Sequence, residues 1–400
     1  MKRTLLRSCL LVLLVTVAVA ADAQPFSVTF VIDLRAEIAA GRFHPETEKV
    51  GVRGGIVPLS WSESLLAADP DGDGLYEAAA TYARAPFGGQ AITYKYKIER
   101  PGHPYEGWED GRNRQLFLEG ATQRVSRIWN APPDPIRISR VGTIRRHPAF
   151  GSKHVAPRDV QVYLPPGYER EPKRLYPVLY LHDGQNVFDG AEQGMEWQVD
   201  ETAEGLIAAG RIEPVLIVAV HNSSARTEDY TPWHVERKRS DGTIEKEGGK
   251  AGLYARFLIE ELKPFIDRTY RTRRAAADTA VGGASFGGLV SLWLALEHPK
   301  VFGGALAVSP AAIWADDALV RQVEALRRKP SLRVWVDVGT AEGDDYVAAV
   351  HRLRDALLKK GWKAGSDFAF VEQEGGGHDE ISWASRVEGM LLFLYGSAHR

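Results

Sequence analysis

Hydrophobic and polar positions follow one pattern before residue 130 and another after it. In the first part, apolar residues form short runs separated by glycine and proline turns, and over 92–98 they alternate strictly with polar residues. Alternation with a period of two places one face of a strand against a core. A series of such short strands predicts a β-sandwich over residues 24–130. The runs span 27–34, 49–53, 76–82, 91–99, 114–118 and 125–129.

From residue 136 to residue 400, apolar runs of strand length alternate with longer stretches of helical periodicity. Strands that are apolar throughout, each followed by a helix, predict a mostly parallel sheet covered by helices on both faces. The predicted fold class is therefore α/β, with a doubly wound sheet. Strands are predicted over 160–164, 176–181, 214–220, 305–309, 332–338 and 369–372, and helices over 199–209, over 252–270, from 347 onward and over 380–395.

The sequence Gly283-Ala284-Ser285-Phe286-Gly287 joins a run of small and apolar residues to the apolar run 289–296. This G-x-S-x-G spacing between a strand and a helix is typical of a nucleophile elbow, a sharp turn that exposes the serine hydroxyl. Glycines in the turn let the two backbone segments approach closely. We therefore predict that Ser285 is a catalytic nucleophile; the alternative is a glycine-rich turn with an incidental serine.

A serine nucleophile needs a base, and the candidate lies downstream. His378 stands in a glycine-rich loop between the last predicted strand and the last predicted helix. Glycines in this loop would let it approach the elbow. Its neighbour Asp379 is interpreted as the N-cap of the last helix rather than as a catalytic acid.

The acid that orients the histidine should stand just past the end of a strand. Glu342 has this position, although Asp344 and Asp345 follow closely and remain alternatives. With Glu342 as the acid, the order Ser285, Glu342, His378 is that of α/β-hydrolases.

The oxyanion of an acyl-transfer intermediate needs two backbone donors. One is the N–H of the residue after the nucleophile, Phe286, and the other is expected from the loop after an early strand. In this chain that loop is 182–186, and we select the N–H of Gln185.

Aromatic and basic residues near predicted strand ends are candidates for substrate binding, because ligands of open α/β sheets bind at the carboxyl ends of the strands. For each tryptophan, ordinary packing is the alternative. Arg226 is predicted to meet an anionic group of the substrate or else to pair with Glu228. The candidates are Trp197, Arg226 and Trp314, with Trp233 and Trp383 in similar loops.

Several motifs of the second part resemble one family of α/β-hydrolases. They are 180–189 (YLHDGQNVFD), 260–267 (EELKPFID), 283–288 (GASFGG), 309–310 (SP) and 377–380 (GHDE). This combination is similar to the esterase family that includes feruloyl esterases, siderophore trilactone esterases and mycolyltransferases. The resemblance covers about 152–395 and implies an α/β-hydrolase fold and ester chemistry, without fixing the substrate. In the feruloyl-esterase relatives the acid follows a Gly-Thr-x pattern, which again implies Glu342.

The first part resembles the starch-binding type of carbohydrate-binding module, an immunoglobulin-like β-sandwich. The resemblance rests on 71–77 (DGDGLYE), 94–96 (YKY), 107–110 (GWED) and 113–114 (NR). It implies that Lys95 and Trp108 bind a glucan or another glycan. A second tryptophan of the family site would fall near Leu75, which is not aromatic. The alternative is that Trp61 and Trp108 are core residues of a domain that only positions the second one.

Two short segments flank these parts. Residues 1–23 combine a basic start, a short apolar run and an Ala-Asp-Ala site, the pattern of a cleaved signal peptide. Cys9, within this segment, is the only cysteine of the chain, so no disulfide or cysteine metal ligand is expected in the mature protein. We predict a periplasmic or secreted protein. The proline-rich segment 131–135 is predicted to be a linker between the two domains.

Charge and composition narrow the possible partners. The formal net charge of −2 favours neither nucleic acid nor an anionic membrane surface. The acidic segment 69–74 imitates the start of an EF-hand calcium loop, but Ala80 stands where the bidentate glutamate is required, so a turn is predicted. No metal or organic cofactor is expected.

The sequence thus predicts an exported serine esterase whose partner is a small-molecule or polysaccharide-linked ester. Carbohydrate-linked or aryl esters of feruloyl or acetyl type are the expected substrates. The alternatives are acyl transfer to a sugar on the same fold and a non-catalytic glycan-binding protein.

Overall fold

The computed structural model describes most of the chain. The predicted signal peptide lies outside the described residues, as does the part of the proline linker from residue 133 onward. Within the described part, no helix combines the length and the apolar character needed to cross a membrane. The described ranges are 25–54, 58–61, 63–82, 91–101, 106–111, 113–117, 121–132, 141–189, 195–238 and 243–396.

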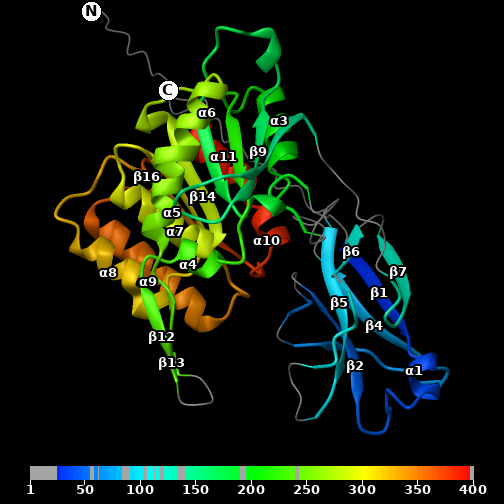
Figure 1. Ribbon diagram of the computed structural model, residues 1–400. Helices are drawn as coiled ribbons and strands as arrows, with labels where there is room; N and C mark the ends of the chain where they lie inside the picture. Colours follow the sequence, from blue (N-terminus) through cyan, green and yellow to red (C-terminus); the bar gives the residue numbers. More distant parts are fainter. Residues whose placement is uncertain are drawn as a thin grey trace, which may run out of the picture.

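The N-terminal part, at the lower right of Figure 1, contains two small sheets. Its elements are β1 (Phe26–Asp33), α1 (Arg35–Ala39), β2 (Lys49–Gly54), β3 (Leu65–Leu66), β4 (Leu75–Tyr82), β5 (Ala91–Glu99), β6 (Arg114–Phe117) and β7 (Thr122–Ile128). One sheet has the order β4-β1-β7 and the other the order β3-β2-β5-β6. The alternation over 92–98 buries Tyr94 and Tyr96 in one hydrophobic cluster with Phe30 and Ile32 of β1. Both sheets therefore share a single core.

The C-terminal part is built on one eight-stranded sheet of order β17-β16-β15-β14-β10-β11-β9-β8. Its strands are β8 (Thr143–Phe150), β9 (Arg158–Leu164), β10 (Val178–His182), β11 (Leu216–Val220), β14 (Thr279–Ser285), β15 (Gly304–Pro310), β16 (Arg333–Gly339) and β17 (Phe368–Gln373). Neighbouring strands from β17 to β11 are parallel, and β9 and β8 continue the sheet in antiparallel pairing. The prediction of a mostly parallel sheet is confirmed.

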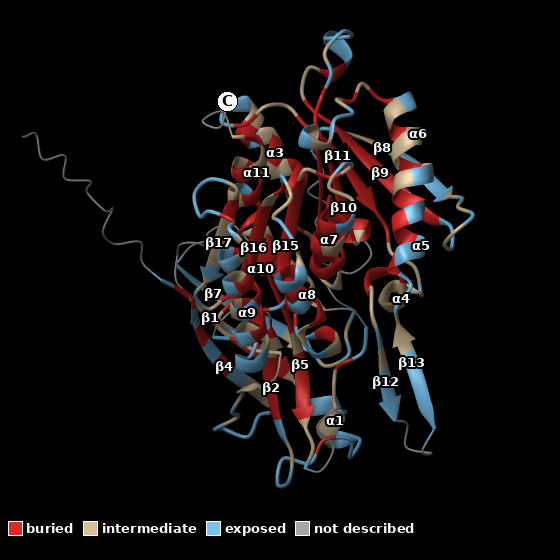
Figure 2. Ribbon diagram, turned by 90° about the vertical axis from the view of Figure 1, so that its left-hand side faces the viewer, coloured by how far each residue is buried: buried red, intermediate tan, exposed pale blue. Residues whose placement is uncertain are grey.

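Residue alternation along the strands divides the core into two clusters, one on each face of this sheet. In β10, Val178 and Tyr180 belong to one cluster, and Leu179 and Leu181 to the other. Helices α5 (Ala251–Arg256), α7 (Phe286–Glu297) and α9 (Asp344–Lys360) supply side chains to the first cluster. Helices α3 (Val199–Ala208) and α11 (Val387–Tyr395) supply side chains to the second. Figure 2 shows the strands of this sheet as the most deeply buried elements.

Some elements differ from the sequence prediction. The helix predicted over 252–270 is α5, a π-helical turn at Phe257–Leu262 and α6 (Lys263–Thr269) in succession. The last predicted helix is divided into α10 (Glu380–Ala384) and α11. Outside the prediction altogether are β8 and a hairpin of β12 (His234–Lys238) and β13 (Ile244–Gly248), which projects from the sheet in Figure 2.

The two parts touch where α10 meets β5. Figure 1 shows α10 on the side of the C-terminal part that faces the small sheets. Ile381 of α10 is only 6% exposed and belongs to the core cluster of the N-terminal part. Because His378 comes just before α10 in the sequence, the N-terminal part packs against the segment that carries the predicted base.

Candidate active site

Ser285 occupies the corner between β14 and α7 that the motif predicts. It is the last residue of the strand and the N-cap of the helix, with φ 58° and ψ −121°. Such a conformation is strained for a residue with a side chain and is typical of a nucleophile elbow. A Cβ atom on Gly283 would lie 2.9 Å from the backbone carbon of Gly287, which explains why this turn requires glycine.

Glu342 and His378 form a direct pair. The Nδ1 atom of His378 lies 2.8 Å from Oε2 of Glu342, whose side chain is fully buried, whereas the imidazole is 34% exposed. Asp344 and Asp345, the alternative acids, are exposed at the start of α9. The geometry therefore favours Glu342 over both of them as the partner of the histidine.

The second carboxylate oxygen of Glu342 is held by two donors. The N–H of Gly339 lies at 2.7 Å and the hydroxyl of Ser309 at 2.5 Å from Oε1. Ser309 in turn accepts hydrogen bonds of 3.1 Å from Trp383 Nε1 and from Arg386 Nη2. These bonds fix the carboxylate so that its other oxygen faces the histidine.

A buried ion pair lies behind this network. Arg386 Nη1 is 3.0 Å from Oδ1 of Asp337, which also accepts the N–H of Ser309 at 2.9 Å. Burial raises the pKa of Asp337, and the charge of Arg386 opposes that shift. Sequence analysis missed Ser309, Arg386 and Asp337 as supports of the site. An aspartate within an apolar strand was the available signal, since a buried carboxylate needs partners.

Tyr346, also missed, contacts both ends of the predicted triad. Its ring meets the His378 ring edge-on at 5.0 Å between centroids. Its hydroxyl donates to the Ser309 carbonyl at 2.8 Å and lies beside the Ser285 side chain. Burial, with the nearby Glu342 charge, raises the pKa of Tyr346. The phenol is therefore a neutral group beside the serine hydroxyl.

The predicted oxyanion loop follows β10 directly. Gln185 lies in a short 3₁₀ turn, Gly184–Asn186, and is buried. A Cβ atom on Gly184 would lie 2.6 Å from the backbone of Ala219, so the loop presses against β11. Phe286, the other predicted donor, is the first residue of α7, where helix N–H groups have no partner within the helix.

Arg226 holds the oxyanion loop rather than pairing with Glu228. It begins α4 (Arg226–Tyr230), and its Nε and Nη2 atoms each lie 2.8 Å from a carboxylate oxygen of Asp183. Burial alone would lower the pKa of Arg226, but this two-point bond raises it above its usual value. Asp183 adopts φ 55° at the entrance to the loop. The arginine thus stabilises a strained backbone two residues before Gln185.

The predicted substrate tryptophans occupy different environments. Trp197 is 3% exposed and packs against Trp383 at 5.6 Å, so it belongs to the core and not to a surface open to ligand. Trp383 lies edge-on to His378 at 5.2 Å and supports the imidazole. Trp314 and Trp233 line a separate pocket with a volume of about 1020 Å³.

Lys95 and Trp108, the predicted glycan-binding residues, have separate partners. Lys95 Nζ donates to the Gly111 carbonyl at 2.5 Å. Trp108 instead lies 6.2 Å from the ring of Trp61 and 5.8 Å from the ammonium of Lys97, a residue two positions further along β5. Lys97 thus stands beside the indole where Lys95 was expected.

One acidic group in the described part of the chain has carboxylates close enough to share a cation. Oxygen atoms of Asp69, Asp71 and Asp73 lie within 4.8 Å of one another. Asp69 already accepts the N–H groups of Gly72 and Gly74 at 2.9 Å each, as in an ordinary acidic turn. This agrees with the predicted turn.

Comparisons with known proteins identify an esterase family. The family model described as "Putative esterase" matches residues 154–394. The chain is 28% identical over 251 residues to the uncharacterized protein YjcH of Bacillus subtilis, covering 60% of this chain and 93% of that protein. It is 27% identical over 241 residues to the endo-1,4-beta-xylanase/feruloyl esterase of Xylanibacter ruminicola, covering 58% of this chain and 29% of that protein.

A siderophore esterase and a solved structure extend the comparison. Ferri-bacillibactin esterase BesA of Bacillus subtilis is 31% identical over 157 residues, covering 38% of this chain and 54% of that protein. The enterobactin esterase FES from Shigella flexneri, solved in the presence of enterobactin, superposes with a TM-score of 0.62 at 15% identity and covers 94% of each chain. At that identity the likeness concerns the fold alone.

Proposed function

The chain belongs to this esterase family and is a carboxylic ester hydrolase, and from that premise we propose that it acts through an acyl-serine intermediate at Ser285. The observation that supports this proposal most strongly is the bond of 2.8 Å between His378 Nδ1 and the buried Glu342 carboxylate. A carboxylate at Nδ1 selects the tautomer whose Nε2 accepts a proton. Without that bond the imidazole would have no preferred tautomer, and Nε2 would not be kept free to accept the serine proton.

In the proposed acylation step, His378 Nε2 removes the hydroxyl proton as Ser285 Oγ attacks the ester carbonyl. The carbonyl π bond opens, and its electron pair moves onto the oxygen. The N–H groups of Phe286 and Gln185 stabilise that oxyanion. Collapse of the intermediate expels the alcohol, which takes the proton from His378.

Deacylation repeats these steps with water as the nucleophile. His378 removes a proton from water, the new C–O bond forms, and Ser285 Oγ leaves with the proton returned to it. Glu342 stabilises the imidazolium in both halves of the cycle. We infer that Tyr346 keeps the serine hydroxyl oriented between turnovers, since its phenol lies beside that side chain.

We propose carbohydrate-linked or aryl esters as substrates, hydrolysed outside the cytoplasm. One relative is named as a feruloyl esterase, and a feruloyl ester carries an aromatic acyl group, which supports this substrate class. We propose that the N-terminal part is an immunoglobulin-like sandwich, and the ring contact between its Trp61 and Trp108 supports a link to carbohydrate. Delivery to a polysaccharide would raise the local substrate concentration.

The test is Ser285→Ala, assayed on a simple aryl ester. Turnover is expected to fall on the order of 10⁴-fold or more, because the covalent route is lost. The exposed residue Ser366 provides a control, and Ser366→Ala should retain both turnover and labelling by a fluorophosphonate. Turnover near that of the wild type in Ser285→Ala would refute the proposal. Failure of the folded wild type to label would favour a non-catalytic glycan-binding protein.

A further inference from the structure

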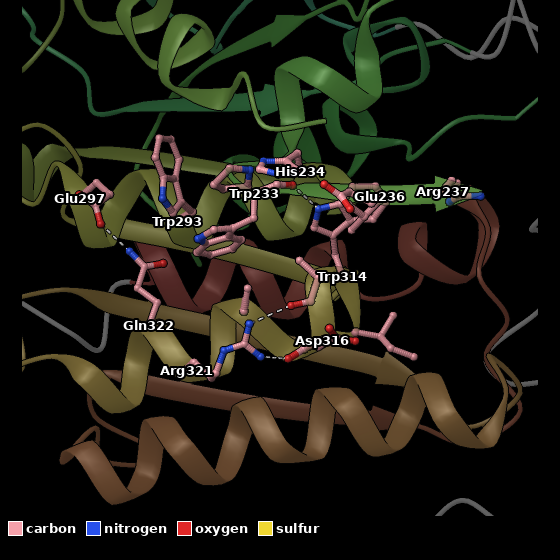
Figure 3. A pocket seen from close by; sticks show the side chains of 15 residues that line it. Trp233, His234, Glu236, Arg237, Trp293, Glu297, Trp314, Asp316, Arg321 and Gln322 are labelled. Carbon is pink, nitrogen blue, oxygen red and sulfur yellow. Dashed lines mark hydrogen bonds between the residues drawn. The ribbon is translucent and has the colours of Figure 1, made fainter. Parts of the chain in front are cut away.

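A large pocket lies on the flank of α7, between that helix, α8 (Trp314–Ala325) and the β12–β13 hairpin. It has a volume of about 1020 Å³, and Figure 3 shows the side chains that surround it. Trp293 and Glu297 reach it from the second and third turns of α7. With a rise of about 1.5 Å per residue, they lie roughly 12 and 18 Å along the helix from Ser285. The pocket is therefore distinct from the position of the nucleophile.

Three tryptophans, each from a different element, line this pocket, which we call the tryptophan pocket. Trp293 belongs to α7, Trp314 begins α8, and Trp233 precedes β12. Trp314 Nε1 donates to the Trp233 carbonyl at 2.7 Å, which fixes the hairpin against α8. The Trp314 ring also meets the Phe286 ring edge-on at 4.9 Å. One wall of the pocket is thus in contact with the residue that follows the nucleophile.

The charged groups around the pocket do not suit an anionic ligand. The lining includes two arginines and three carboxylates, those of Glu236, Glu297 and Asp316. Both arginines have partners: Arg237 lies 2.5 Å from Glu247, and Arg321 donates to backbone carbonyls of the pocket rim. With three carboxylates against two arginines, of which Arg237 is already paired with Glu247, the lining offers no excess of positive charge to a ferric catecholate or a polyuronate.

A neutral, hydroxylated ligand matches the same lining. Indole faces accept the apolar C–H face of a sugar ring, and carboxylates accept its hydroxyl protons. The amide of Gln322, bonded to Glu297 at 2.5 Å, adds a donor and an acceptor at the pocket's edge. The combination of several indoles with acidic and amide groups therefore fits a saccharide better than a purely apolar aryl group.

The rim of the pocket has a backbone that costs free energy to maintain. Ala315, Asp316 and Asp317 are consecutive non-glycine residues with φ of 51°, 55° and 60°, a left-handed conformation that such residues avoid. Arg321 holds this segment through the carbonyls of Ala315 and Asp316, and Arg352 pairs with Asp317 at 2.6 Å. Strain that neighbouring groups maintain in this way is found at ligand-binding segments.

We propose that the tryptophan pocket binds a neutral oligosaccharide and so holds the carbohydrate portion of an ester whose acyl group lies at Ser285. This inference rests on the proposed function and names the part of the substrate that lies away from the ester bond. It also gives the C-terminal part a glycan site of its own, separate from Trp108 in the N-terminal part.

The test is a titration of the full chain carrying Ser285→Ala, which removes turnover, with neutral xylo-oligosaccharides and malto-oligosaccharides in separate arms. Saturable binding to one of them is expected. Trp293→Ala in the same background should weaken it at least about tenfold, as for a buried aromatic contact. Trp293→Phe keeps an apolar ring in place, so its affinity should lie between that of the Ser285→Ala chain and that of the chain with Trp293→Ala added. Such an intermediate affinity shows that the loss in the alanine variant is not merely a result of unfolding.

Trp108→Ala in the same background is the matched control. If it abolishes binding while Trp293→Ala and Trp293→Phe do not, the site is in the N-terminal part and the inference is wrong. Binding of an oligogalacturonate or free ferulate, with no binding of either neutral saccharide, would also overturn it. The titration needs no catalysis, so its failure is distinguishable from retained turnover in Ser285→Ala, which would instead refute the serine mechanism.

Discussion

The serine site and the tryptophan pocket lie along the same helix, α7, but they consist of different kinds of side chain and contact. At the serine site, a fully buried carboxylate has a hydrogen-bond partner on each of its oxygens. In the pocket, indoles from two helices and a loop, of which Trp314 is buried and Trp233 and Trp293 are half-buried, surround a wide space. The first arrangement fixes the position of protons, and the second offers apolar area. Substitutions in the first should therefore change turnover, and substitutions in the second should change affinity.

Glu342→Gln should have the largest effect of the changes that leave the nucleophile intact. Gly339 N–H and the Ser309 hydroxyl both donate to Oε1, so the glutamine carbonyl must occupy that side and its NH₂ group must face His378 Nδ1. The histidine would then carry its proton on Nε2 and could not act as a base. We expect kcat on a small aryl ester to fall on the order of 10⁴-fold, with little change in KM.

The control for this change is Asp344→Asn, which alters the exposed aspartate two positions further on. It should leave kcat close to that of the wild type. If Asp344→Asn were the more damaging of the two, the acid of the triad would have to be reassigned.

Arg226→Ala tests whether this arginine supports the oxyanion loop or binds the charge of a substrate. Losing the two bonds of 2.8 Å to Asp183 should let the loop before Gln185 relax, and kcat should fall roughly 10- to 100-fold, less than the loss of a whole donor. The loss should be equal for neutral and anionic aryl esters. A loss confined to anionic esters would mean that Arg226 binds substrate charge instead. Arg256→Ala, which breaks an exposed pair with Glu260, should have no measurable effect.

Asp379→Asn should change stability rather than turnover. Burial raises the pKa of Asp379 to about 7, while its carboxylate caps α10 by accepting the Ser382 N–H at 2.9 Å. The folded protein therefore binds this proton more tightly than the unfolded chain. The resulting stabilisation is complete below about pH 4 and declines as the pH rises to about 7, by on the order of 4 kcal/mol. Asparagine keeps the cap and cannot ionise.

Urea unfolding of Asp379→Asn and wild type at pH 4.5 and pH 8 measures this difference. The wild type should lose more unfolding free energy than the variant between the two pH values. Asp316→Asn, at an exposed aspartate of the tryptophan pocket, should keep the wild-type profile. Parallel profiles for Asp379→Asn and wild type would show that Asp379 is already ionised at the lower pH.

The features that could be predicted from the sequence are those that depend on residues close together along the chain. Strand alternation, the glycines of the elbow and the N-cap at Asp379 each depend on residues within a few positions, and the structure contains all of them. The partners of polar side chains could not be predicted in this way, because they lie far away along the chain. Arg226 pairs with Asp183, 43 positions earlier, and Ser309 bonds Glu342, 33 positions later. Such contacts depend on strand order, which the sequence alone left open.

Packing also determines whether each tryptophan lies in the core or lines a pocket. Trp197 and Trp314 follow predicted strands in the same way, but the first is enclosed by Trp383 and the second by a hairpin that the polar sequence of 234–248 did not suggest. Periodicity identified 252–270 as a helix and could not reveal its π-helical turn, because one extra residue barely alters the apolar spacing.

Ile381 bears on how the two parts of this protein could be exchanged over evolution. It lies three positions after His378 and is buried in the core of the N-terminal part. Deleting that part would expose this side chain, at a cost of about 2 kcal/mol, beside the loop that carries the histidine. A gene fusion that supplied a different N-terminal module would have to offer an apolar surface at the same place. Recombination is therefore expected to preserve the pairing of these two parts more strictly than a proline linker alone would require.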